Sequence, residues 1–237
     1  MKKFLLTNDD GITSDGIIRL AREAVKLGEV WVVAPDGQRS AASHSITLRH
    51  AFEVWPVEFP VQGVHAYACN GMPGDCVRVG VLNLVPGKPD FVLSGINNGY
   101  NMASDLQYSA TVGAAFEASF QGIQAIAFSE GSEEHHEVTD RYLFRIMQEL
   151  IQKPLPEQTI WNVNFPSCKP EECGGVLRER IVSRDVFYQD HYDETVLEDG
   201  KISYRVVGVR KYEASPNTDL LAILENYVSI GTATNIS

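Results

Sequence analysis

Two adjacent carboxylates, Asp9 and Asp10, are the strongest chemical signal in the sequence. They directly follow a short apolar run at residues 4–7, which reads as a buried strand. Carboxylates about 4 Å apart repel each other by roughly 4 kcal/mol at an effective dielectric constant of 20. Such a pair persists when it is solvated, shares a proton or binds a cation. The spacing alone fits a metal site and, equally, a turn in which Asp9 is a cap and Asp10 faces water.

Ser40 and Asn97 each follow another predicted strand, at residues 30–34 and 91–93. In open α/β sheets, ligands bind outside the carboxyl ends of the strands. We therefore expect the loops that carry Asp9, Asp10, Ser40 and Asn97 to face one another. Carboxylate, hydroxyl and amide oxygens suit a hard divalent ion such as Mg²⁺ or Mn²⁺.

Ser109 and Thr111 lie where a helix of small residues is expected to begin, at residues 109–120. A helix N-terminus offers free N–H groups and a positive dipole end, which favour phosphate. Taken alone, these two residues are more typical of an ordinary N-cap. The sequence has neither the GxGxxG pattern nor the P-loop pattern, which counts against a dinucleotide or P-loop site.

The elements that must position these residues alternate between strand and helix. The strand expected at residues 30–34 is apolar on both sides, which is typical of a parallel sheet covered on both faces. The alternation predicts a doubly wound α/β core over residues 1–166. The further strands expected are 64–68, 125–128 and 160–164, and the further helices are 17–25, 75–85 and 138–151.

The character of the chain changes after Pro166. Two extended stretches, 181–187 and 202–209, are joined by a polar segment and predict a long β-hairpin. An isolated hairpin is marginal in water, so this one must pack on its own core or on a second subunit. A last helix or strand is expected at 220–228. We therefore treat residues 167–237 as an appended hairpin and oligomerisation arm of a single domain.

Composition excludes several classes of protein. The 237 residues carry 20 Lys and Arg and 31 Asp and Glu, a net charge of 20 − 31 = −11. This charge counts against wrapping of a nucleic acid duplex, which needs clustered cations, but it leaves a nucleotide substrate open. Four cysteines without a CxxC pair favour a reducing compartment. No apolar stretch approaches the roughly 20 residues of a membrane span, so we expect a cytoplasmic protein that does not contact a membrane.

The sequence resembles the SurE family, the survival protein SurE 5′/3′-nucleotidases. The matching motifs occur in family order over residues 1–130, and weaker matches follow at 164–166 and 218–219. The matching motifs are residues 6–11, 33–36 with 39–43, 70–77, 94–99 and 108–112.

The resemblance implies a Rossmann-like three-layer core with a C-terminal arm that forms homodimers or homotetramers. It also implies hydrolysis of nucleoside 5′- and 3′-monophosphates with one divalent ion per subunit. By motif position, Asp9, Asp10, Ser40 and Asn97 match the family's metal ligands. Ala110 departs from the family pattern, which usually has glycine there, and the tail at 215–219 is also unusual.

The resulting hypothesis is metal-assisted hydrolysis with Asp9 and Asp10 as catalytic residues. Asp9 would accept or orient a proton of the attacking water, while Ser109 and Thr111 would hold phosphate oxygens. Three alternatives stay open. They are a receiver-like signalling module, a phosphatase of the haloacid dehalogenase type, and a nucleotide-binding protein without turnover. The first needs an aspartate near position 97, where this chain has Asn97, and the second needs a DxD spacing.

Overall fold

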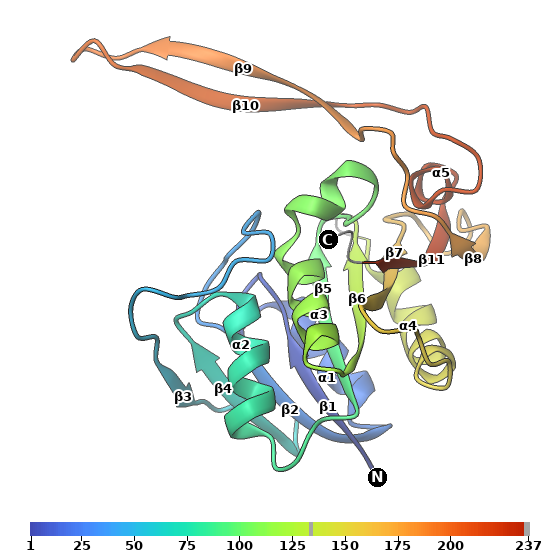
Figure 1. Ribbon diagram of the computed structural model, residues 1–237. Coiled ribbons are helices and arrows are strands. Elements are labelled where there is room, and N and C mark those ends of the chain that lie inside the picture. Colours follow the sequence, from blue (N-terminus) through green and yellow to red (C-terminus); the bar gives the residue numbers. More distant parts are fainter. Residues whose placement is uncertain (133–134, 235–237) are drawn as a thin grey trace.

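The computed structural model describes residues 1–132 and 135–234, and its main feature is a nine-stranded sheet (Figure 1). The strand order is β3-β4-β2-β1-β5-β6-β7-β11-β8. Six neighbouring strands from β4 to β7 are parallel, whereas β3 and β11 run antiparallel to the strands they join, β4 and β7. The strands are β1 Lys2–Thr7, β2 Gly28–Pro35, β3 Val54–Pro56, β4 Val64–Cys69, β5 Phe91–Asn98, β6 Gln124–Glu130, β7 Thr159–Phe165, β8 Gly175–Arg180 and β11 Tyr227–Thr234.

Helices cover both faces of this sheet, and each face has its own apolar core. On one face, α1 and α4 contribute buried residues such as Leu20 and Leu143. On the other face, α2 and α3 contribute residues such as Val77 and Ala115. The helices are α1 Asp15–Ala24, α2 Pro73–Val79 with a π-helical continuation Gly80–Leu84, a 3₁₀ helix Ala103–Tyr108, α3 Ala110–Phe120, α4 Glu137–Leu150 and α5 Asp219–Leu224. The predicted three-layer α/β core with a mainly parallel sheet is therefore confirmed.

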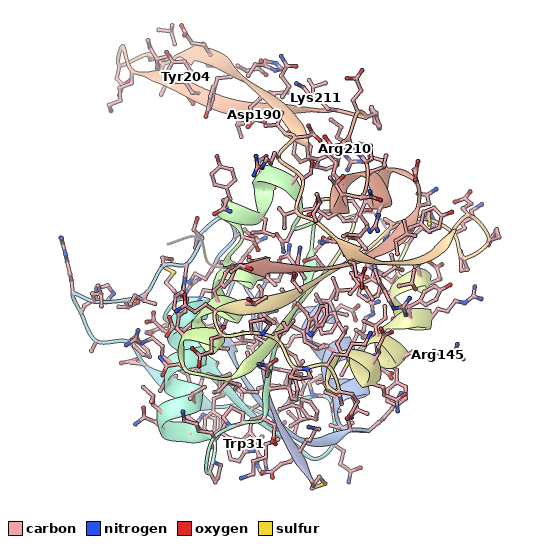
Figure 2. All side chains as sticks on the ribbon, turned by 45° about the vertical axis from the view of Figure 1, so that its right-hand side comes forward. Trp31, Arg145, Asp190, Tyr204, Arg210 and Lys211 are labelled. Atoms are coloured by element: carbon pink, nitrogen blue, oxygen red, sulfur yellow. The ribbon has the colours of Figure 1, made fainter. Side chains whose placement is uncertain are left out.

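A two-stranded hairpin, β9 Tyr188–Val196 and β10 Ile202–Arg210, extends away from the core (Figure 1). Its β10 strand lies where it was expected, but the strand predicted at 181–187 is wrong, because these residues lie outside any strand and β9 begins only at Tyr188. The segment before it stays on the core because Phe187 is buried in an apolar cluster with Met102 and Leu220. Figure 2 labels Asp190, Arg210 and Lys211 near the base of the hairpin and Tyr204 farther out.

The chain beyond residue 166 contributes more to the core than the sequence suggested. The segment expected to be a helix or a strand is both, because α5 is followed by β11. Strand β11 pairs with β7 and with β8, so both β8 and β11 belong to the main sheet. The hairpin is the part of the predicted appendage that extends away from the sheet (Figure 1). Among the described residues, none of the helices combines the length and the apolar character needed to cross a membrane.

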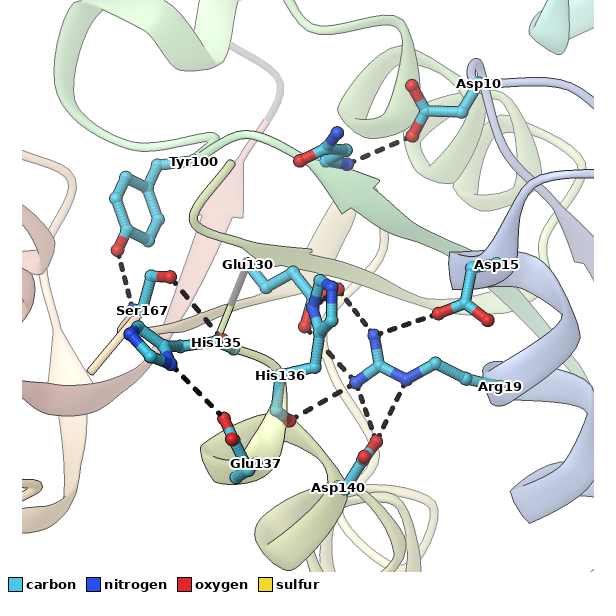
Figure 3. A network of polar contacts seen from close by, with 11 residues as sticks. Asp10, Asp15, Arg19, Tyr100, Glu130, His135, His136, Glu137, Asp140 and Ser167 are labelled. Atoms are coloured by element: carbon cyan, nitrogen blue, oxygen red, sulfur yellow. Dashed lines mark hydrogen bonds and ion pairs between the residues drawn. The ribbon is translucent and has the colours of Figure 1, made fainter. Parts of the chain in front are cut away.

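A buried ion-pair network around Arg19 joins α1, the end of β6 and the start of α4 (Figure 3). Arg19 Nη1 donates to Glu130 Oε1 at 2.6 Å, and its Nη2 donates to Asp140 Oδ1 at 2.7 Å. Arg19 and Glu130 are 8% and 4% exposed, so neither charge is well solvated. Removing one member of such a pair leaves the other charge buried without compensation.

We expect Arg19→Ala to destabilise the fold by about 3 kcal/mol and to lower Tm by about 10 °C. The matched control is Arg22→Ala, which removes an arginine from the same helix outside this network. Thermal unfolding followed by circular dichroism measures both variants. Equal Tm values for the two variants would show that the Arg19 network does not stabilise the fold.

Candidate metal and phosphate site

The carboxyl ends of three neighbouring parallel strands meet at one edge of the sheet. Strand β1 lies between β2 and β5. Asp9 and Ser40 follow β1 and β2, whereas Asn97 is the penultimate residue of β5 itself. All three residues line one open cleft of about 340 Å³, together with Ser109. The structure thus brings together three of the four predicted metal ligands and one of the two predicted phosphate-binding residues.

The turn after β1 fixes the backbone of the acidic pair. Gly11 has a φ of 101°, a conformation that favours glycine. Asn8 Nδ2 donates to the Gly11 carbonyl at 2.9 Å and to Ser14 Oγ at 2.8 Å. From the loop after β2, the Arg39 N–H donates to the Asp9 carbonyl at 2.7 Å. The Asn-Asp-Asp-Gly sequence is therefore one rigid turn that presents its carboxylates at a fixed place.

Asp9 is a buried carboxylate, only 3% exposed. Its Oδ1 accepts a hydrogen bond from the Thr111 hydroxyl. Burial raises the pKa of Asp9 to about 6, and the charge of Asp10 contributes to this rise, although the Thr111 hydrogen bond opposes it. The ionised form of Asp9 is therefore unfavourable in this protein unless a cation compensates it.

Asp10 is half-buried and lies beside the cleft. Its Oδ2 accepts a hydrogen bond from the Asn98 N–H at 3.0 Å (Figure 3). Burial raises the pKa of Asp10, and the hydrogen bond from Asn98 partly offsets that rise. The side chain lines a second hollow, of about 200 Å³, which also includes Glu130 and His136. The Asp10 carboxylate thus lies beside the cleft, next to Asp9, and one of its oxygens is engaged by the Asn98 N–H.

The side chains around Asp9 offer the oxygen atoms that a hard divalent cation prefers. Asn97 Nδ2 donates to the Gly99 carbonyl at 2.8 Å, which leaves the amide Oδ1 of Asn97 as the acceptor. Ser40 adds an exposed hydroxyl to the same cleft. Within residues 1–132 and 135–234, no cluster of three or more His, Cys, Asp and Glu could hold a metal. An ion held here therefore needs the hydroxyl and amide oxygens as well as the carboxylates, and the donor set fits Mg²⁺ or Mn²⁺.

Ser109 and Thr111 differ in what their hydroxyl groups do. Ser109 is the N-cap of α3, because its Oγ accepts the Val112 N–H at 3.1 Å, and it also lines the cleft. Thr111 is fully buried, and its hydroxyl is committed to Asp9. Ser109 is therefore placed to contact a ligand directly, whereas Thr111 orients Asp9.

Sequence reasoning missed several residues that complete the cleft. They come from the loop after β5, from the 3₁₀ helix and from the base of the hairpin. No local pattern marks the hairpin residues, because their approach to the cleft depends on long-range packing. The missed residues are Tyr100, Asn101, Asp105, Tyr108, Tyr188 and Asp190.

A buried amide network holds the loop after β5 in place. Asn101 N–H donates to Asn164 Oδ1 at 2.9 Å, and Asn101 Nδ2 donates to Ser129 Oγ at 2.8 Å. The Asn101 carbonyl accepts from Nδ2 of Asn162 at 2.9 Å and from Nδ2 of Asn164 at 3.0 Å. The asparagines of strand β7 thus support one wall of the cleft from below, which explains polar residues inside a buried strand.

Comparisons with known proteins identify the family of the chain. The family model "Survival protein SurE" matches residues 4–186. A protein named 5′-nucleotidase SurE from a Thermoanaerobacter species is 38% identical over 236 residues, covering 96% of this chain and 90% of that protein. The protein of the same name from Pelobacter propionicus is 39% identical over 229 residues, covering 95% and 90%.

A solved structure extends the likeness to three dimensions. The crystal structure of the SurE protein from Aquifex aeolicus superposes with a TM-score of 0.82 at 35% identity, and the match covers 99% of this chain and 94% of that one. The matches span nearly the whole chain, including the turn that carries Asp9 and Asp10. The chain therefore belongs to the SurE family.

Proposed function

We propose that this protein is a divalent-metal-dependent nucleotidase that hydrolyses nucleoside 5′- and 3′-monophosphates to nucleoside and phosphate. The observation that carries the proposal is the buried Asp9 carboxylate beside Asp10, in a cleft that also contains Ser40 and Asn97. The names of the relatives, 5′-nucleotidase SurE, support a nucleotide substrate.

Asp9, Asp10, Ser40 and Asn97 would hold one divalent ion per subunit, with Mg²⁺ or Mn²⁺ as the expected metals. When bound, the ion would neutralise phosphoryl oxygens and polarise a water molecule, which are general roles of metals in hydrolysis.

Residues of the chain itself then accept the proton, hold Asp9 in position and bind the phosphate. Asp9 accepts a proton from the attacking water, and the Thr111 hydroxyl keeps the Asp9 carboxylate in position. Ser109 and the N–H groups at the start of α3 bind phosphate oxygens, because a helix N-terminus favours anions. Thr111 contributes to phosphate binding only through the order it gives to this helix start and to Asp9.

We further propose that the hairpin joins two or more copies of the chain into a homodimer or homotetramer. The hairpin presents many apolar and aromatic side chains to solvent, and a two-stranded ribbon alone is marginally stable. These exposed side chains are Tyr192, Val196, Leu197, Ile202, Tyr204, Val206 and Val209.

The four cysteines are free thiols, which supports a cytoplasmic location.

The catalytic proposal is tested by Asp9→Asn and Asp10→Asn. Each variant keeps the shape of the side chain but removes one charge from the ion site, so we expect hydrolysis of AMP to fall by about 100-fold or more. Phosphate release with added Mg²⁺ or Mn²⁺, and after treatment with EDTA, is the measurement. The matched control is Asp199→Asn, an exposed aspartate in the hairpin turn. Full activity in either variant, or in metal-free protein, contradicts the proposal.

Metal-free Asp9→Asn protein should be more stable than metal-free wild type. Because burial raises the pKa of Asp9 from 3.8 to about 6, the folded state disfavours the ionised carboxylate. The destabilisation is fully present above about pH 6 and disappears below about pH 4. At pH 7.5 we expect the variant to gain on the order of 1–3 kcal/mol in the free energy of unfolding.

Urea unfolding in EDTA at pH 7.5 and at pH 4 measures this difference. The amide that replaces the Asp9 carboxylate would still accept the Thr111 hydrogen bond, so the comparison isolates the charge. Adding Mn²⁺ at pH 7.5 should stabilise the wild type and leave the variant nearly unchanged. A variant that is less stable than wild type in EDTA at pH 7.5 would show that the Asp9 charge is compensated without a cation.

The assembly proposal is tested by shortening the hairpin. Replacing residues 193–205 with an Asn-Gly turn removes the outer apolar part and keeps Tyr188 and Asp190 at its base. We expect the shortened protein to sediment as a monomer, while the Asp199→Asn control keeps the oligomeric mass. Equal oligomeric masses for the shortened and full-length proteins would exclude the hairpin as the contact.

A further inference from the structure

The cleft that contains Asp9 has a second wall, which the proposed chemistry does not use. This wall carries three tyrosines and two aspartates from the 3₁₀ helix, the loop before it and the base of the hairpin. The cleft volume of about 340 Å³ lies at the small end of the range of about 300–1,000 Å³ for ligand pockets, so it suits one small molecule. The residues of this wall are Tyr100, Asp105, Tyr108, Tyr188 and Asp190.

Tyr188 is an aromatic ring held in a fixed orientation. The rings of Phe187 and Tyr188 pack edge to face with centroids 4.6 Å apart. Phe187 is only 4% exposed and also packs edge to face on Tyr100, at 6.4 Å. The Tyr100 hydroxyl in turn accepts a hydrogen bond from the Ser167 N–H at 2.9 Å (Figure 3). The position of Tyr188 at the cleft is therefore fixed by the core.

Tyr108 supplies a second ring beside the phosphate site. It directly precedes Ser109, the N-cap of α3, and its side chain is 64% exposed at the cleft. Exposed aromatic rings bind the flat faces of nucleobases with little dependence on which base is present. Tyr188 and Tyr108 thus come from separate segments and line one cleft. Ser109 and the start of α3 form the proposed phosphate-binding end of that cleft.

The two carboxylates of the second wall favour contact with the uncharged nucleoside part of a substrate over contact with its phosphate group. Asp105 and Asp190 line the same cleft. Burial raises the pKa of Asp105, the Ser104 hydrogen bond opposes this rise, and the charge of Asp190 adds to it. Carboxylates repel a phosphate group but accept hydrogen bonds from hydroxyl and amine groups. Asp190 lies two residues after Tyr188 on strand β9, so both side chains point to the same face of the hairpin.

We propose that this wall is the nucleoside subsite, in which the nucleobase stacks on Tyr188 and Tyr108 and Asp190 accepts a hydrogen bond from a sugar hydroxyl. The inference rests on the proposed nucleotidase function and deepens it, because it assigns recognition of the leaving group to the base of the hairpin. It makes these residues determinants of specificity for nucleotides over phosphate esters that lack a base.

The test compares kcat/KM for AMP, ribose 5-phosphate and glycerol phosphate in the wild type and in four variants. Tyr188→Leu and Tyr108→Leu should each lower the value for AMP by about tenfold and change the value for glycerol phosphate by less than about twofold. Tyr188→Phe keeps the stacking ring and should retain the wild-type preference. Asp190→Asn should lower the values for AMP and ribose 5-phosphate and spare glycerol phosphate.

The matched control is Tyr212→Leu, which changes a tyrosine that follows strand β10, is 76% exposed and does not line the cleft. This variant should match the wild type on all three esters. An equal fall for AMP and glycerol phosphate in Tyr188→Leu would show a merely structural role and overturn the proposal. So would an unchanged preference for AMP in both tyrosine-to-leucine variants.

The proposed function can fail separately from this subsite. If the wild type hydrolyses none of the three esters, the nucleotidase proposal is wrong, and binding of AMP measured by calorimetry decides the subsite. About tenfold weaker binding of AMP to Tyr188→Leu than to wild type then supports the subsite. Equal binding, or no binding to either protein, overturns it.

Discussion

The electrostatic cost of burying Asp9 next to Asp10 is the constraint on which the site depends. A carboxylate that is 3% exposed lacks the water that would stabilise its charge, and a neighbouring carboxylate makes ionisation less favourable still. The surrounding groups recover only part of this cost through the hydrogen bonds from Thr111 and Asn98. We propose that a divalent cation balances the remaining charge, and the proposed hydrolysis of phosphate esters would require the same cation.

The fold holds that unfavourable arrangement in place. Strand β1 lies in the middle of the parallel sheet, with apolar cores on both faces, so the turn after it cannot relax away from the cleft. The Arg19 network and the Asn101 network brace the neighbouring loops at the same sheet edge. Packing elsewhere in the molecule thus compensates for the unfavourable free energy of the site, as is general for functional sites.

The sequence was sufficient to predict most of the core and the end of the cleft that carries Asp9, Ser40 and Asn97. Apolar strands alternating with amphipathic helices specify a doubly wound sheet, and the strand-end rule then places Asp9, Ser40 and Asn97 together. The sequence could not predict that residues 181–187 stay on the core, because Phe187 is buried by Met102 and Leu220, which are distant in sequence. For the same reason, Tyr188 and Asp190 could not be assigned to the cleft. The partner of the Thr111 hydroxyl, Asp9, also depends on tertiary contacts rather than on the helix-start pattern.

We infer that Asp9 and Asp10 tolerate each other because a divalent ion binds between the strand ends. Calorimetric titration of metal-free protein with Mn²⁺ tests it most directly, since the heat of binding is independent of any substrate. We expect one ion per chain in the wild type, with affinity at least about tenfold weaker in Asp9→Asn and in Asp10→Asn. Undiminished binding in both variants, or no binding to the wild type, would contradict it.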